Sequence, residues 1–222
     1  MGLAATSSAF LLAISGLFSI INPVGGALIF HDATSDRTHA ERLALANRVG
    51  LYSLLVMLGA LWAGSYVLNF FGITLGALRI AGGLVVASNA WQRLNAPEQQ
   101  EARKQRQAEH SGPIEDVAFF PLTMPFTTGP GTISVAISLG AERPARGDGL
   151  LWFFLGASAA AAVMAALILL AYRTAEPLMG LLGPSGARIV ARMMAFLLLC
   201  IGAQIAITGV QELVLPMLAG RS

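Results

Sequence analysis

Residues 14–30 decide the fold class of this chain, and they read ISGLFSIINPVGGALIF. They belong to a stretch without Asp, Glu, Lys or Arg over residues 1–31, which is longer than the roughly 20 residues that a bilayer-spanning helix needs. Asn22-Pro23 interrupts this stretch, because proline has no N–H to donate and its ring clashes with the preceding turn. Glycines follow at positions 25 and 26. The pattern predicts a membrane-spanning helix that is broken near its middle.

Further uncharged stretches cover residues 49–78, 117–141, 149–172 and 193–211. The chain of 222 residues is 55% hydrophobic and only 12% charged, about half the charged fraction of a typical soluble domain. We therefore predict an all-α polytopic membrane protein with six transmembrane helices, near residues 5–30, 47–68, 72–94, 116–140, 149–172 and 189–215. Met1 to Ile21 carries no Lys or Arg, so it lacks the basic start of a signal peptide and is expected to remain as the first span.

Cap and turn signals support this division. Thr38 and Glu41 have the spacing of a capping box, which begins the polar lead-in to the second span. Asn69-Phe70-Phe71-Gly72 predicts a turn that divides the run of residues 49–78 between two spans. Another break is expected between Gly180 and Gly186, where a Gly-Pro pair occurs.

The charged residues predict the orientation and exclude some classes of function. Ten Lys or Arg residues fall on the side of the loops after spans one, three and five, and four fall on the other side. The positive-inside rule then predicts a bacterial inner-membrane protein with both termini in the periplasm. A formal net charge of +2 is too small for nucleic-acid binding. The single cysteine, Cys200, excludes a disulfide framework and a cysteine-based metal site.

A second break is predicted in the fourth span, which contains Pro121, Pro125 and Pro130. Gly129-Pro130-Gly131-Thr132 opens the second half of the chain as Asn22-Pro23 opens the first. Since each half has an odd number of spans, the second half must enter the membrane from the opposite side. We predict a 3+3 inverted-topology repeat with a broken first helix in each half, an arrangement found in many secondary transporters. Residues 1–94 form the first repeat, 95–115 a cytoplasmic polar linker and 116–222 the second repeat.

Arg79 and Arg192 occupy similar positions in the two predicted repeats, each after a glycine-containing entry to the third span. A guanidinium within a membrane is costly and is commonly functional. Both side chains are also close enough to a span end to reach the interface. A gating or substrate-contacting role and a structural anchoring role therefore both remain open.

The breaks are the predicted substrate site. An interrupted helix presents bare N–H groups at one new end and bare carbonyls at the other. The N–H groups attract a carboxylate, whereas carbonyls and hydroxyls suit an ammonium group or Na⁺, so a small zwitterion would fit. Thr127 and Ser134 add hydroxyl groups nearby. The predicted substrate-binding residues are Asn22, Pro23, Gly25, Thr128, Gly129, Pro130, Gly131 and Thr132. No metal site or cofactor is predicted, and a simple proline kink that helps the helices to pack is the alternative.

The chain resembles the MarC family of small inner-membrane proteins from about residue 10 to residue 212. The stretches that carry the resemblance are Ile21-Asn22-Pro23-Val24-Gly25, Thr34 through Arg42, Arg79-Ile80-Ala81-Gly82-Gly83, and Pro121-Leu122 with Gly129-Pro130-Gly131-Thr132-Ile133. The resemblance implies a six-span transporter-like fold and, as for the SnatA group, transport of small neutral amino acids such as glycine and alanine. Gly26 departs from the family pattern, in which a polar residue is frequent.

Three other classes of function are alternatives to the transport of small solutes. An enzyme is not expected, because His31, His39 and His110 all fall in loops and no span has an Asp or Glu at its centre. A membrane scaffold or regulatory protein, and a translocator of lipids or drugs, remain open. The missing central carboxylate disfavours a buried proton relay, while Na⁺ coupling and exchange remain open. The sequence predicts neither the direction of transport nor the oligomeric state.

Overall fold

The computed structural model describes residues 2–95, 117–144 and 149–219, and its regular elements there are all helical. The elements are α1 (Gly2–Ile21), α2 (Pro23–Ala33), α3 (His39–Phe70), α4 (Leu75–Asn95), η1 (Ala118–Thr127), α7 (Pro130–Ala141), α8 (Gly149–Arg173) and α9 (Ala175–Ala219). The predicted polar linker 95–115 lies outside the described residues except for Asn95.

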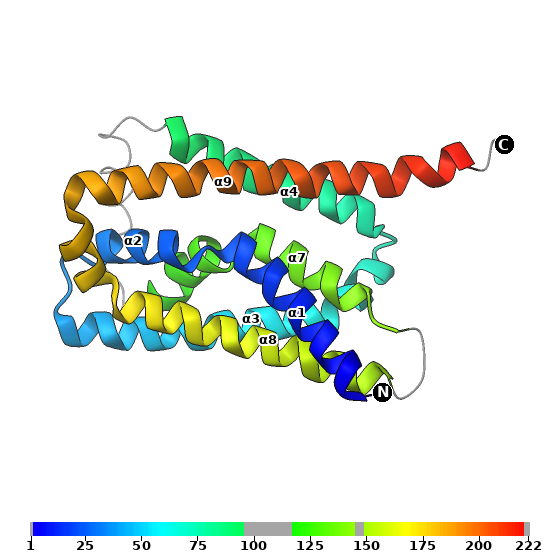
Figure 1. Ribbon diagram of the computed structural model, residues 1–222, viewed down its shortest axis with the longest axis horizontal. Coiled ribbons are helices and arrows are strands. Elements are labelled where there is room, and N and C mark those ends of the chain that lie inside the picture. The colour runs from blue at the N-terminus through cyan, green and yellow to red at the C-terminus, as the bar shows by residue number, and fades with distance from the viewer. Residues whose placement is uncertain (1, 96–116, 145–148, 220–222) are drawn as a thin grey trace.

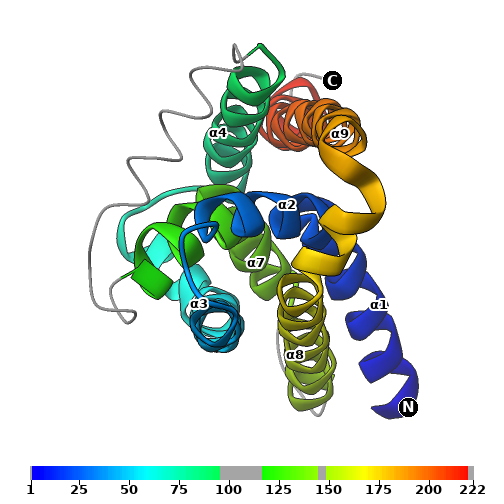
Figure 2. The same cartoon turned by 90° about the vertical axis from the view of Figure 1, so that its left-hand side faces the viewer.

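The helices run roughly along one common direction in three layers (Figure 1). Seen end-on, α4 and α9 lie side by side on one face, α3 and α8 form the opposite face, and α2 and α7 lie between them (Figure 2). The beginning of α1 and the end of α9 lie at the same end of the bundle (Figure 1). The helices that follow the two breaks, α2 and α7, therefore form the middle layer of the molecule.

The predicted break in the first span is confirmed at Asn22. This residue has φ 48° and ψ 71°, in the left-handed region that asparagine tolerates better than most residues. Its side-chain Oδ1 accepts a hydrogen bond of 3.1 Å from the N–H of Gly25 and thereby caps the start of α2. Pro23 occupies the first turn of α2, where its missing N–H costs nothing.

The fourth span is irregular, as its prolines predict. The π-helix η1 contains extended backbone angles at Phe120 (φ −126°, ψ 120°) and Met124 (φ −112°, ψ 122°). Each of these residues precedes a proline, whose ring pushes the preceding residue out of the helical region. The helix η1 ends at Thr127 with Thr128 as its C-cap, and α7 begins only after Gly129. Both broken helices of the sequence interpretation are therefore present.

Three further signals are confirmed. Thr38 and Glu41 form the capping box of α3. Gly72, with φ 66°, forms the turn before α4, and Gly183, with φ 63°, kinks α9. A β-carbon would be strained at both glycines, because the left-handed region is open mainly to glycine.

Four helical segments are long and apolar enough to cross a membrane, namely Thr6–Ala33, His39–Phe70, Gly149–Arg173 and Ser185–Leu215. The α7 helix is apolar but shorter. The α4 helix is the least hydrophobic of the long helices, because its 21 residues include Arg79, Arg93 and several polar side chains. The all-helical membrane fold is thus shown, and the number of six spans stays a prediction.

Candidate functional site

The two helix breaks lie beside each other. Gly16 of α1 faces Val135 and Leu139 of α7, while Ile20 of α1 faces Gly131, so the two helices pack antiparallel. A side chain at Gly131 would force its β-carbon into Val86 Cγ2 of α4 and place it 3.5 Å from Ile20 Cδ1. The carbonyl end of α1 therefore lies next to the N–H end of α7.

The two N-terminal ends at the breaks are capped differently. Asn22 caps α2 with its own side chain. The N-cap of α7 is Gly129, which has no side chain to offer, and a β-carbon there would lie 2.5 Å from the carbonyl oxygen of Pro125. The first turn of α7 therefore begins without a side-chain cap, and a helix start of this kind favours an external acceptor.

Tyr172 of α8 connects the two broken helices. Its hydroxyl lies 2.7 Å from Thr127 Oγ1, and Thr127 already donates to the Leu122 carbonyl at 2.7 Å, so the tyrosine is the donor between them. The Tyr172 ring stacks on Phe30 of α2, with centroids 4.6 Å apart. A β-carbon at Gly26 would lie only 2.8 Å from the tyrosine hydroxyl. Gly26 thus leaves the room that Tyr172 occupies.

The predicted substrate-binding residues gather around these breaks, with different exposure. Pro23, Gly25, Thr128, Gly131 and Thr132 are buried, Asn22 and Gly129 are half-buried, and Pro130 is exposed. Thr128 donates within η1, to the Thr123 carbonyl at 3.3 Å. Ser134 donates to the Leu78 carbonyl of α4 at 3.2 Å and lies against Gly82.

Arg79 and Arg192 are not in equivalent surroundings. The Arg79 side chain is 14% exposed and forms ion pairs with Glu142, at 2.9 Å, and with Glu212. Its Nε also donates to Ser138 Oγ at 3.4 Å. Arg192 is exposed on α9. The register between α4 and α9 is set by glycine pairs, Gly76 with Gly209 and Gly83 with Gly202. This register does not place Arg79 and Arg192 in equivalent positions.

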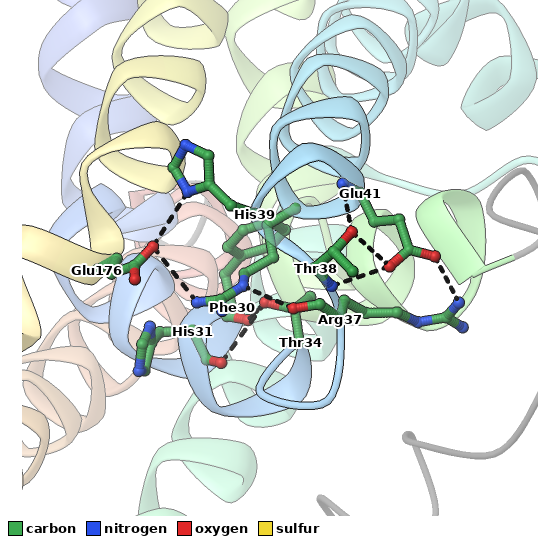
Figure 3. Close-up of polar contacts among 9 residues, drawn as sticks. Phe30, His31, Thr34, Arg37, Thr38, His39, Glu41 and Glu176 are labelled. Carbon is green, nitrogen blue, oxygen red and sulfur yellow. Dashed lines mark hydrogen bonds and ion pairs between the residues drawn. The ribbon is translucent and has the colours of Figure 1, made fainter.

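A second polar cluster lies at the opposite end of the bundle, where α2, α3 and α9 begin or end (Figure 3). Glu176 accepts a hydrogen bond from His39 Nδ1 at 3.2 Å and pairs with Arg42 at 3.6 Å. The hydrogen bond from His39, followed by the charge of Arg42, lowers the pKa of Glu176 below its ordinary value. These residues line a small pocket together with His31, Tyr172 and Arg173.

Sequence reasoning missed Tyr172 and Glu176. Tyr172 precedes Arg173 at the end of an apolar run, and that pattern is typical of an aromatic residue at the membrane interface. The acidic partner of His39 and Arg42 lies 137 residues away from His39 in the chain, so no local pattern could have indicated it. Among the described residues, no group of three or more His, Cys, Asp or Glu side chains could hold a metal ion.

Comparison with known proteins assigns the family. The family model for MarC family integral membrane proteins matches residues 7–214. The chain belongs to the MarC family. Its relatives include the inner membrane protein MarC of Salmonella typhimurium and of Citrobacter koseri, each 34% identical over 203 residues, which cover 89% of this chain and 92% of the relative. The Escherichia coli protein of the same name is 32% identical over the same length. No solved structure matches the chain.

Membership of the MarC family confirms the resemblance seen in the sequence. Together with the apolar helices, it identifies a multi-pass protein of the inner membrane. The names of these relatives state a location and no chemical activity.

Proposed function

We propose that this MarC protein transports small neutral amino acids across the inner membrane by alternating access. The observation that carries the proposal is the meeting of two interrupted helices in the middle of the bundle. In secondary transporters, such interruptions supply the N–H and carbonyl groups that bind a substrate away from water.

The packing of the helices supports a six-span inverted repeat. An inverted repeat would relate α1–α2, α3 and α4 of the first half to η1–α7, α8 and α9 of the second half. Under this correspondence, each major helix–helix contact has a counterpart that is also present in the structure. The contacts of α2 with α8 and α9 become those of α7 with α3 and α4, and the α4–α9 and α3–α8 contacts map onto themselves. The common location of the beginning of α1 and the end of α9 (Figure 1) fits an even number of crossings.

The chemistry of the site fits a zwitterion. The uncapped start of α7 at Gly129 suits a carboxylate, because helix N-termini attract negative charge. The adjacent carbonyl end of α1 and the hydroxyls of Thr128 and Thr132 suit an ammonium group. Ile20 and Val86, both buried, lie against Gly131 and give this side of the site an apolar wall.

The distribution of arginines supports the predicted orientation. The start of α3 and the ends of α4 and α8, which lie together at the left-hand end in Figure 1, carry Arg42, Arg93 and Arg173. We assign this end to the cytoplasm and both termini to the periplasm. Coupling to Na⁺ through carbonyl and hydroxyl oxygens is compatible with the site, as is exchange without an ion.

The test is uptake of labelled glycine, alanine and serine into proteoliposomes, with and without Na⁺ and pH gradients. The diagnostic variant is Thr132→Val, which removes a buried hydroxyl beside the α7 break and keeps the shape of the side chain. The matched control is Thr208→Val, where the hydroxyl only donates within α9 to the Gln204 carbonyl, at 2.9 Å. We expect saturable uptake that Thr132→Val weakens by roughly tenfold, as for one lost hydrogen bond to a charged group, and that Thr208→Val leaves unchanged.

Absence of uptake for all three amino acids under every gradient, with folded protein, would reject them as substrates. Flux of a fluorescent lipid or a drug under the same conditions would then identify a translocator of larger solutes. Absence of any flux would favour the scaffold or regulatory alternative. Saturable uptake that Thr132→Val leaves unchanged would move the site away from the α7 break.

A further inference from the structure

The charged side chains near the two ends of the bundle join one half of the chain to the other. At one end, Arg79 of α4 pairs with Glu142, directly after α7, and with Glu212 of α9. At the other end, His39 and Arg42 of α3 pair with Glu176 of α9. In each cluster the arginine belongs to the first half of the chain, as does His39, and the carboxylates belong to the second half. We call these the Arg79 cluster and the Glu176 cluster.

Each cluster is reinforced by a second polar contact between the halves. Near the Arg79 cluster, the guanidinium of Arg143 lies over the ring of Tyr66, 4.6 Å from its centroid. Near the Glu176 cluster, Arg173 donates to Asn47 Oδ1 from Nε at 3.0 Å and from Nη2 at 2.6 Å. Contacts of this kind oppose separation of the halves at that end.

Both clusters lie close to the helix breaks, on opposite sides of them. Arg79 and Val86, the residue that packs on Gly131, are seven positions apart on α4, which is about 10 Å along a helix. Glu176 follows four positions after Tyr172, the residue that contacts Thr127. The stacked rings of Phe30 and Tyr172 lie between that break and the Glu176 cluster. The breaks therefore lie between the two clusters along the bundle.

We propose that the Arg79 and Glu176 clusters are the two gates of the transporter, and that each opens while the other stays closed. The inference rests on the proposed alternating access and adds the residues that perform it. Both gates are closed in this structure, as in an occluded state. Opening one end separates its ion pairs, and the second cluster then holds the two halves together at the far end, which prevents a continuous pore.

The composition of the clusters determines which substitutions open each gate. The Glu176 cluster depends on one carboxylate, so Glu176→Gln removes the ion pair with Arg42 and the charged acceptor of the hydrogen bond from His39. The Arg79 cluster depends on one guanidinium, so Arg79→Gln leaves Glu142 and Glu212 without their shared cation. The double variant Glu142→Gln/Glu212→Gln weakens the same gate from the other side. It also guards against a folding defect that is particular to Arg79→Gln.

The experiment measures access to the breaks from each side. Cys200→Ala removes the single cysteine, and Thr132→Cys, buried beside the α7 break, is the reporter. A membrane-impermeant thiol reagent is applied to right-side-out and to inside-out vesicles, and the labelling rate is measured on each. The control Glu41→Gln neutralises a carboxylate that pairs with Arg37, at 3.6 Å, within one half.

We expect Arg79→Gln and the double glutamate variant to raise labelling from one side by about tenfold, the effect of a modest bias on a two-state equilibrium. Glu176→Gln should raise it from the other side, and Glu41→Gln from neither. The proposal is overturned if each gate variant raises labelling equally from both sides, if none changes it, or if the control matches the gate variants. The labelling experiment contains no solute, so it does not depend on the identity of the substrate. Side-specific labelling without amino-acid uptake would therefore reject amino acids as the substrate but support the two gates. Uptake with unchanged labelling would reject the gates alone.

Discussion

Gly26 and Tyr172 form the residue contact on which the joining of the two breaks depends. The tyrosine hydroxyl occupies the space that a β-carbon at position 26 would need, at 2.8 Å, and donates from there to Thr127. Since both residues are packed against helices, neither can move without a cost. A glycine at position 26 is therefore required by the position of Tyr172.

Gly26→Ala is expected to destabilise the protein by about 1–3 kcal/mol, the usual cost of adding a methyl group to a packed site. Tyr172→Phe, which loses one hydroxyl, should cost only about 1 kcal/mol, because Thr127 keeps its bond to the Leu122 carbonyl. Thermal unfolding in detergent measures both. Gly180→Ala is the control, since nothing lies within 4 Å of a β-carbon there. A Gly26→Ala protein as stable as the unaltered chain would contradict the packing described.

At the residue scale, the sequence predicted local features well and distant partners poorly. The break at Asn22 was predictable, because Pro23 follows it and glycines come soon after, and a proline in the interior of a helix interrupts it. Tyr172 and Glu176 were not expected, because their partners come from other helices and no periodicity connects them. The correspondence of Arg79 with Arg192 rested on similar spacing alone, and the two side chains lie in different surroundings.

At the element scale, α4 and α9 are held by two pairs of glycines. Gly76 lies against Gly209, and Gly83 lies against Gly202, so that the backbones of the two helices touch. Small residues at such crossings allow close approach, which is the main source of helix association where no hydrophobic effect operates between helices. The seven-residue spacing on each helix fixes the register.

Gly202→Ala should therefore destabilise the α4–α9 pair, because its β-carbon would lie 2.6 Å from the Ala87 nitrogen and 2.8 Å from the Gly83 carbonyl. We expect a loss of about 1–3 kcal/mol, measured as a lower midpoint of thermal unfolding in detergent. Gly59→Ala is the matched control, since nothing lies within 4 Å of its β-carbon. That control should be neutral or more stable by up to about 1 kcal/mol, the difference in helix propensity. Equal stability of the two variants would argue against a tight crossing.

The interruptions of the helices were predictable for a simple reason. Proline acts through its own ring and missing N–H, so its effect on η1 and on the start of α7 does not depend on neighbouring helices. The pairing of α4 with α9 was not predictable in the same way. Glycines are frequent throughout the chain, and only the folded structure distinguishes those at a crossing, such as Gly83, from those facing open space, such as Gly59.

At the scale of the whole molecule, the bundle has a broken helix from each half at its centre and a charged cluster near each end. The hydrophobic composition alone predicted an all-helical membrane protein, and the match to the MarC family agrees with it. The six-span inverted repeat and the transport of amino acids rest on symmetry and site chemistry, and they remain predictions. Alternating access requires the two halves to move against each other about the breaks.

Distances between spin labels near the two ends of the bundle report this movement. In a Cys200→Ala background, one pair of labels is placed at Ile73 and Leu151, and the other at Ser35 and Leu181, all exposed positions with one member in each half. Pulsed electron paramagnetic resonance then records both distance distributions in lipid, with and without saturating alanine. Under alternating access, alanine is expected to shift the two distance distributions in opposite directions, because one end of the bundle closes as the other opens. Two distributions that stay fixed, or that widen together, would contradict it.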